Sequence, residues 1–146
     1  MILVTSAGGK TGRAMIAAFA AAGEPVRAML RRADADDELR VLGAAEVVHG
    51  DLTDAAAVAA AAQGCRAIYY ICPNMTEDEK VIGDNVIAAA KAAGTERLMF
   101  HSVLHTQVQA LQHHWNRMFV EEAIVESGVP YSILQVGSYY QNMLPG

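Results

Sequence analysis

Six short apolar segments alternate with five segments of helical length, and this alternation limits the possible folds more than any other feature of the sequence. We expect strands near residues 1–5, 25–30, 45–49, 66–71, 96–101 and 131–136. We expect helices between them, near residues 11–22, 34–42, 54–62, 77–93 and 109–127. Strands separated by helix-length segments are typical of βαβ units, in which successive strands run parallel. The sequence therefore predicts an α/β fold, a doubly wound parallel sheet of about six strands with right-handed connections.

Glycines and capping residues mark the ends of the expected helices. A glycine follows each helical segment: Gly23, Gly43, Gly64, Gly94 and Gly128. Glycine is favoured there because a left-handed helix exit carries no side-chain penalty for it. Thr53 is expected to start the helix at 54–62, and Thr76 with Glu79 forms a capping box for the helix at 77–93.

Length and composition favour one globular domain, spanning residues 1–146, with 53% hydrophobic and 18% charged residues. The net charge of −5 argues against direct contact with nucleic acid or an anionic membrane. Cys65 and Cys72 are too few for a disulfide framework and lack zinc-ligand spacing, so we expect a reducing, cytoplasmic setting. No signal peptide is visible, and the alanine-rich run at 55–62 is too short to cross a bilayer.

The stretch VTSAGGKTGRA, residues 4–14, has features of two phosphate-binding loops. A triphosphatase loop requires a glycine five positions before its Gly-Lys pair, and Val4 occupies that position. A dinucleotide-binding loop requires glycines at three-residue spacing between a strand and a helix. Ser6, Gly9 and Gly12 have that spacing, with serine in the first glycine position. The dinucleotide loop is the better match, and an ordinary strand-to-helix turn is the alternative.

Each glycine of this loop has a separate expected role. Gly9 would let the backbone approach a pyrophosphate, and Gly12 would let the helix pack close to the strand. The helix N-terminus would supply unpaired amides and a partial positive charge. The candidate phosphate-binding residues are Ser6, Gly9, Lys10, Thr11 and Gly12.

Two arginines follow the second expected strand, where enzymes that prefer NAD carry an acidic residue for the ribose hydroxyls. Arg31 and Arg32 instead suit a 2′-phosphate, because guanidinium groups form bidentate hydrogen bonds with phosphate. Lys10 and Arg13 in the neighbouring turn would add positive charge. The sequence therefore favours NADP, with NADPH preferred over NADH; a solvated basic strand end is the alternative.

Several motifs in order resemble the NmrA-like family of atypical short-chain dehydrogenases, which have a Rossmann fold. They are MILVTSAGGKTGR, VRAMLRR, GDLTD at 50–54, KAAGTERLMFHSV at 91–103, the spacing from Val120 to Leu134, and Tyr-Tyr-Gln-Asn at 139–142. The resemblance implies that Asp51 and Leu52 lie beside the adenine, and Cys72 and Pro73 beside the nicotinamide ribose. The family includes quinone and isoflavone-type reductases, and also non-catalytic sensors that bind the dinucleotide and regulate transcription.

The resemblance also suggests catalytic positions, with two departures from the Ser, Tyr and Lys of short-chain dehydrogenases. Ser102 matches the serine, His113 stands where the tyrosine would be, and Arg117 stands where related chains carry lysine. Arginine can hold the nicotinamide ribose, but it cannot exchange a proton at neutral pH. Histidine could act as the acid near its ordinary pKa of about 6.5, and His114 is the rival to His113.

Members of this family are about twice as long, so the resemblance covers their N-terminal half. The chain lacks the C-terminal portion that covers the substrate pocket, and it is either a fragment or a short natural member. A homo-oligomer or a second subunit could complete such a pocket.

Two functional hypotheses follow. The first is an NADP(H)-dependent oxidoreductase that reduces a small carbonyl, quinone or enone by hydride transfer. The second is a non-catalytic NADP(H)-binding redox sensor or regulatory module. Zinc binding by the histidines at 101, 105, 113 and 114 is disfavoured, because no nearby acid or cysteine completes a site.

Overall fold

The sheet has six parallel strands in the order β3-β2-β1-β4-β5-β6. The computed structural model describes residues 1–139. The strands are β1 (Ile2–Val4), β2 (Val26–Leu30), β3 (Ala44–His49), β4 (Ala67–Tyr70), β5 (Arg97–Val103) and β6 (Tyr131–Val136). The helices are α1 (Lys10–Ala21), α2 (Asp36–Val41), α3 (Ala55–Ala62), α4 (Glu79–Ala93) and α5 (Gln112–Glu126), with a short 3₁₀ helix, η1 (Ala33–Ala35), before α2. The predicted doubly wound parallel sheet is confirmed.

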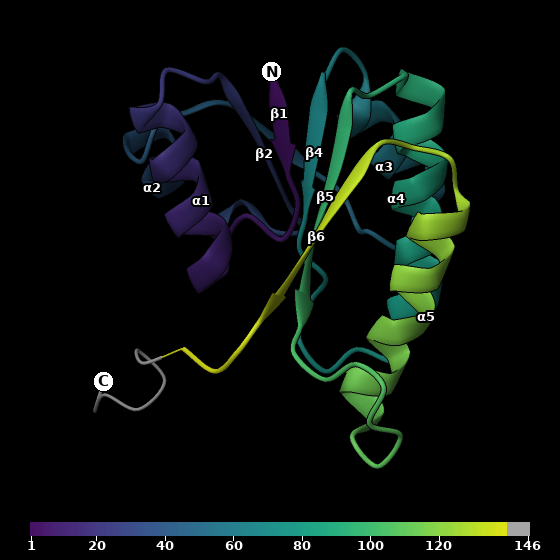
Figure 1. The fold of residues 1–146 in the computed structure, drawn as a ribbon. Coiled ribbons are helices and arrows are strands. Elements are labelled where there is room, and N and C mark those ends of the chain that lie inside the picture. Colours follow the sequence, from purple (N-terminus) through teal and green to yellow (C-terminus); the bar gives the residue numbers. More distant parts are fainter. Residues whose placement is uncertain (140–146) are drawn as a thin grey trace.

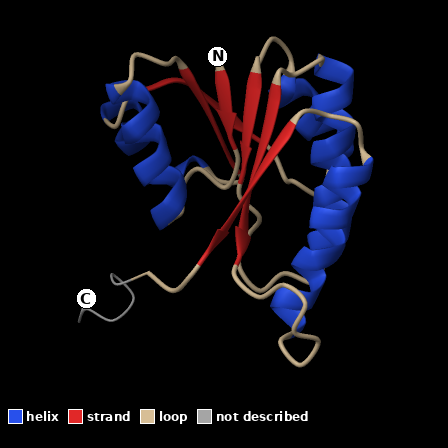
Figure 2. Ribbon diagram, viewed as in Figure 1, coloured by secondary structure: helices blue, strands red, loops and turns tan. Residues whose placement is uncertain are grey.

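Helices cover both faces of the sheet, as Figures 1 and 2 show. On one face α1 and α2 pack against Ile2, Val4 and Tyr69; on the other, α3, α4 and α5 pack against Ile68 and Phe100. Successive strand residues point to opposite faces. Burial on both faces therefore requires the continuous apolar runs that the sequence contains.

The start of two helices differs from the sequence-based expectation. Asp54, and not Thr53, caps α3, since its carboxylate accepts hydrogen bonds from the backbone of the first turn. The prediction that Thr76 and Glu79 form a capping box is wrong. The helix α4 begins at Glu79 itself, after Asp78, so Glu79 is one of its first residues and its side chain turns into the protein interior.

The predicted glycine helix ends are confirmed. All five have positive φ: Gly23, Gly43, Gly64, Gly94 and Gly128. At the end of α4, Gly94 is left-handed with φ of 62°, and its N–H donates to carbonyls of the last helical turn. A residue with a side chain would be strained in this conformation.

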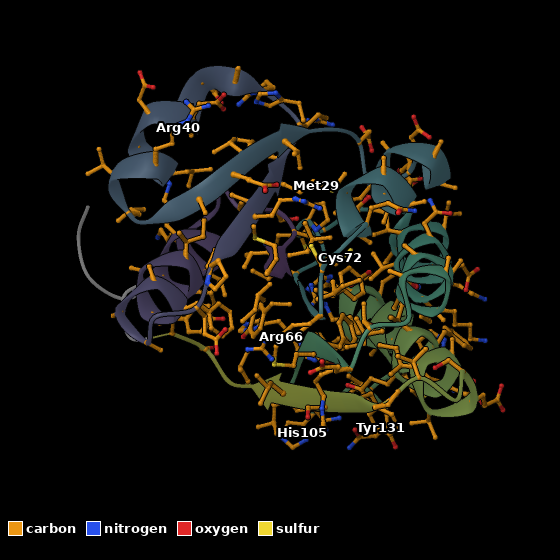
Figure 3. The ribbon with its side chains drawn as sticks, turned by 90° about the horizontal axis from the view of Figure 1, so that it is seen from above. Met29, Arg40, Arg66, Cys72, His105 and Tyr131 are labelled. Atoms are coloured by element: carbon orange, nitrogen blue, oxygen red, sulfur yellow. The ribbon has the colours of Figure 1, made fainter. Side chains whose placement is uncertain are left out.

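Strand order reverses between β1 and β4, because β2 and β3 lie on one side of β1 and β4 to β6 on the other. In an open parallel sheet this reversal leaves a crevice beyond the carboxyl ends of the strands, where ligands bind. Seen from above, Cys72, just after β4, lies near the middle of the molecule, and Tyr131 lies at the β6 edge (Figure 3). Among residues 1–139, no helix combines the length and the apolar character needed to cross a membrane.

Candidate functional site

A cavity of about 1060 Å³ lies at the carboxyl ends of the strands. Every candidate residue from the sequence lines it: Ser6, Gly9, Lys10, Thr11, Gly12, Arg31, Arg32, Asp51, Leu52, Cys72, Pro73, Ser102, His113 and Arg117. These residues come from the ends of β1 to β5 and from α1 and α5. The fold therefore brings them to one place, while the role of each remains a prediction.

The loop after β1 is shaped by Ser6 and Gly12. Ser6 has a left-handed backbone with φ of 48°, and its hydroxyl donates to the carbonyl of Ile71 at 2.9 Å. A Cβ on Gly12 would lie 2.6 Å from the carbonyl oxygen of Ala7, so α1 can approach the loop only with glycine there. A Cβ on Gly9 would meet its nearest atom at 3.4 Å, so space is left above this residue.

The N-terminus of α1 opens into the cavity, and no side chain in the described part of the chain caps it. Gly9 is the N-cap residue, and Lys10 and Thr11 begin the helix. The first amides of a helix have no partner within it, and together with the helix dipole they attract anions. This part of the cavity therefore suits a phosphate group.

The two arginines at the end of β2 are exposed and loosely paired with acids. Arg31 lies 3.8 Å from the carboxylate of Asp51, and Arg32 lies 3.2 Å from that of Asp34. Hydrogen bonds from Thr53 lower the pKa of Asp51, with a smaller effect of Arg31. Because exposed ion pairs contribute little free energy, both guanidinium groups can exchange their acid partners for a phosphate.

Beneath the cavity lies an ion pair that the sequence analysis missed. The fully buried carboxylate of Glu79 is 2.8 Å from Nε of Arg117 and 3.4 Å from Nδ1 of His113. Arg117 also donates to the carbonyl of His101 at 2.5 Å. Both candidate catalytic residues on α5 are thus engaged by one acid on α4.

Helical spacing is the signal that could have identified Glu79. Ile82, Gly83 and Val86 follow it at intervals of three, four and seven residues, and all are buried. A residue at these intervals lies on the same helix face. The acid therefore belongs to the buried face of α4, where it requires a positively charged partner.

Ser102 is also engaged within the protein. Its buried hydroxyl donates to the carboxylate of Glu121 on α5, which also accepts hydrogen bonds from Thr106 and Gln135. The expected contact of this serine with an acceptor oxygen would require the bond to Glu121 to break.

The environment of His113 differs from the expectation of an unperturbed imidazole. Burial lowers its pKa from the ordinary 6.5, and the neighbouring Arg117 and His114 lower it further. The charge of Glu79 does not reverse this direction, because Arg117 lies closer to the acid and balances it. His113 is therefore neutral at neutral pH.

We expect the NMR signals of His113 to titrate with a midpoint below 6.5, the value expected of the urea-unfolded chain. The unfolded state then binds the proton at higher pH than the folded state. The contribution of His113 to the free energy of unfolding is thus complete above about pH 6.5, and it is lost as pH falls towards the folded-state pKa. A folded-state midpoint equal to or above that of the unfolded chain would contradict this environment.

A second series of hydrogen bonds lies on the face of the sheet that α1 covers. The hydroxyl of Tyr69 lies 2.8 Å from Nδ1 of His101, and Nε2 of the same ring is hydrogen-bonded to the hydroxyl of Tyr139. The hydroxyl of Tyr139 also lies 3.3 Å from Oγ1 of Thr11 in the first turn of α1. Side chains alternate along β5, so His101 faces away from Ser102 and towards Tyr69. His101 and Tyr139 both line the cavity.

Comparison with known proteins identifies the family of this chain and agrees with its fold. The model of the NmrA-like family matches residues 1–145. The chain belongs to the NmrA-like family. The predicted resemblance is confirmed, and a Rossmann-type sheet is what the structure contains.

Among proteins similar to this NmrA-like chain are two bacterial reductases. A (4-alkanoyl-5-oxo-2,5-dihydrofuran-3-yl)methyl phosphate reductase of Streptomyces griseus is 34% identical over 99% of this chain and 50% of that protein. Quinone oxidoreductase 2 of Escherichia coli is 29% identical over 99% of this chain and 51% of that protein. The chain spans about half the length of the curated relatives that it matches.

Solved structures show the same fold. The NADPH-dependent quinone oxidoreductase of Escherichia coli in complex with NADPH superposes with a TM-score of 0.84 at 28% identity, over 97% of this chain and 50% of that one. Triphenylmethane reductase of Citrobacter sp. has a TM-score of 0.82 at 23% identity, over 97% of this chain and 51% of that one.

Proposed function

We propose that this chain forms the NADP(H)-binding half of an oxidoreductase that reduces a small carbonyl, quinone or enone by hydride transfer. The observation that carries the proposal is one cavity at the strand-order reversal, joining the glycine loop to Arg31 and Arg32. The similar proteins whose names describe quinone reduction and an NADPH complex support the same class of reaction.

The residues of the cavity fit the dinucleotide. The uncapped start of α1 and the space above Gly9 suit the pyrophosphate. Arg31 and Arg32 suit the 2′-phosphate, because their ion pairs with Asp51 and Asp34 are exposed and contribute little free energy. We therefore propose that the adenosine end lies over β2 and β3 and the nicotinamide end over β4 and β5.

In this orientation of the dinucleotide, we propose a contact for each of the remaining cavity residues. Asp51 and Leu52 would contact the adenosine, and Cys72 and Pro73 the nicotinamide ribose. Arg117 is our candidate for holding that ribose from the cavity floor, since it lines the cavity while paired with Glu79. Bound NADPH supplies the hydride, and the protein positions the acceptor and provides the proton.

Calorimetric titration is expected to show tighter binding of NADPH than of NADH. Substituting Arg31→Ala and Arg32→Ala together should remove most of this preference. A charge-assisted hydrogen bond contributes about 1.5 kcal/mol or more, so the loss should be roughly tenfold or greater. Arg40→Ala, at an exposed arginine on α2 that does not line the cavity, is the matched control and should leave both affinities unchanged. Equal affinity of the wild-type protein for the two dinucleotides contradicts the 2′-phosphate assignment.

The same loop is expected not to support ATP hydrolysis. Val4 is a buried strand residue at the position where a triphosphatase loop begins with glycine. No magnesium-dependent release of phosphate should occur above background. Steady release that is abolished by Lys10→Ala would overturn the dinucleotide assignment of the loop.

A non-catalytic NADP(H) sensor is the second candidate function. It is favoured by the internal contacts of the residues at the usual catalytic positions, since Glu79 holds His113 and Arg117, and Glu121 holds Ser102. Firm NADPH binding without turnover of quinones, enones or aldehydes would support this alternative.

A further inference from the structure

We propose that Tyr139 donates the proton in this reduction, with His101 and Tyr69 as the residues that position its hydroxyl. The inference rests on the proposed function and deepens it by naming the acid of the reaction. It starts from a hydrogen-bonded series, Tyr69 to His101 to Tyr139, that joins β4, β5 and the segment after β6. The last two of these residues line the cavity.

The location of Tyr139 fits an acid at the nicotinamide end. The segment after β6 runs towards the side of the sheet that α1 covers (Figure 1). The hydroxyl of Tyr139 reaches Thr11, next to the glycine loop, and His101 lies on β5. The arginines that mark the opposite, adenosine end follow β2, on the other side of the strand-order reversal. Through His101, Tyr139 is therefore held against β5, in the half of the cavity that we propose for the nicotinamide.

The three residues at the usual catalytic positions are less suited to the task. His113 lies against Glu79, and burial keeps its imidazole neutral. The hydroxyl of Ser102 is already engaged, since it donates a hydrogen bond to the carboxylate of Glu121. Arg117 keeps its charge throughout the usable pH range. Among these cavity residues, Tyr139 has a hydroxyl held by a ring nitrogen that can support the loss of its proton.

His101 and Tyr69 set the direction of the hydrogen bonds. Burial lowers the pKa of His101, and Arg117 lowers it further, so the ring is neutral and carries one N–H. Burial raises the pKa of Tyr69, so its phenol stays protonated and can donate to Nδ1. The ring proton then resides on Nε2 and points at the oxygen of Tyr139. A hydrogen bond from Nε2–H stabilises the negative charge on that oxygen after its proton has left.

The step balances with NADPH and an acceptor as the only reactants besides water. The acceptor carbon gains the hydride and is reduced, while the dinucleotide is oxidised. The O–H bond of Tyr139 breaks and a new O–H bond forms on the acceptor oxygen. The hydrogen bond from His101 holds the phenolate until a proton from solvent restores it.

The test measures steady-state reduction of an aromatic aldehyde and of benzoquinone by NADPH, using the whole 146-residue chain. For Tyr139→Phe we expect kcat with the aldehyde to fall about 10²–10⁴-fold, the usual contribution of a general acid. The Kd for NADPH should change little. The loss should be smaller with benzoquinone, whose product anion is less basic and depends less on an acid. A solvent deuterium isotope effect on kcat should be present in the wild type and reduced in the variant.

Three further variants separate positioning from structure. Tyr69→Phe keeps the ring packing but removes the donor to Nδ1, so it should lower kcat and leave KM and the Kd for NADPH nearly unchanged. His101→Gln should lower kcat in the same way. Tyr131→Phe, at an exposed tyrosine on β6 that does not line the cavity, should have wild-type kinetics.

The outcomes distinguish this inference from the proposed function. A wild-type protein that reduces an acceptor, together with a fully active Tyr139→Phe, overturns the inference alone. Tyr139→Phe that loses NADPH affinity in step with kcat also overturns it, since the residue would then only bind the dinucleotide. A wild-type protein that binds NADPH but reduces neither acceptor overturns the proposed function and the inference with it.

Discussion

Glu79→Ala is expected to lower the free energy of unfolding by about 3–5 kcal/mol, because it leaves a buried charge without its partner. The Arg117 side chain is 5% exposed, and its Nε lies 2.8 Å from the Glu79 carboxylate. Without the carboxylate, the one hydrogen-bond acceptor left to the guanidinium group among residues 1–139 is the carbonyl of His101. Urea unfolding followed by circular dichroism would measure the loss as a lower midpoint with an unchanged slope.

Two control variants identify the cause of that loss. Glu24→Ala removes the acid of a more exposed ion pair, 2.6 Å from Arg66, and should cost no more than about 1 kcal/mol. The double variant Glu79→Leu with Arg117→Met replaces the buried pair by apolar side chains and should recover much of the stability lost in Glu79→Ala. If Glu79→Ala and Glu24→Ala are equally stable, the buried pair is not a stabilising contact.

Gly12→Ala is expected to lower both the stability of the protein and its affinity for the dinucleotide. The added Cβ would lie 2.6 Å from the carbonyl oxygen of Ala7 and 2.7 Å from that of Ser6, and both are backbone atoms. The start of α1 must therefore move away from the loop. Such overpacking costs about 1–3 kcal/mol, more than the roughly 0.5–1 kcal/mol that alanine gains over glycine inside a helix. Thermal unfolding and NADPH titration would measure the two losses.

Gly9→Ala is the matched control in the same loop. Its Cβ would meet nothing closer than 3.4 Å, and its backbone is extended with φ of −80°, so stability should be nearly unchanged. The methyl group would occupy the space proposed for the pyrophosphate, so NADPH affinity should fall. A Gly12→Ala protein as stable as Gly9→Ala would contradict the packing role of Gly12.

Much of the fold and the glycine loop could be predicted because both depend on local sequence. Continuous apolar runs show which segments are strands with helices on both faces. A glycine after each helical segment shows where the chain turns back, and Gly94 is one such end. The spacing of Ser6, Gly9 and Gly12 after a strand indicates a helix start that approaches closely, as the contact of Gly12 with Ala7 shows.

The partners of the polar residues depended on tertiary structure. The sequence by itself determined the α/β class, the glycine loop and the arginines after β2, because each is a pattern within a few neighbouring residues. The position of Glu79 beside Arg117 was decided by the packing of α4 against α5, and the contact of His101 with Tyr139 by the path of the chain after β6. These pairs are 38 residues apart in each case. Contacts over such a distance form only when strand order and helix packing bring the segments together, and no local pattern specifies them.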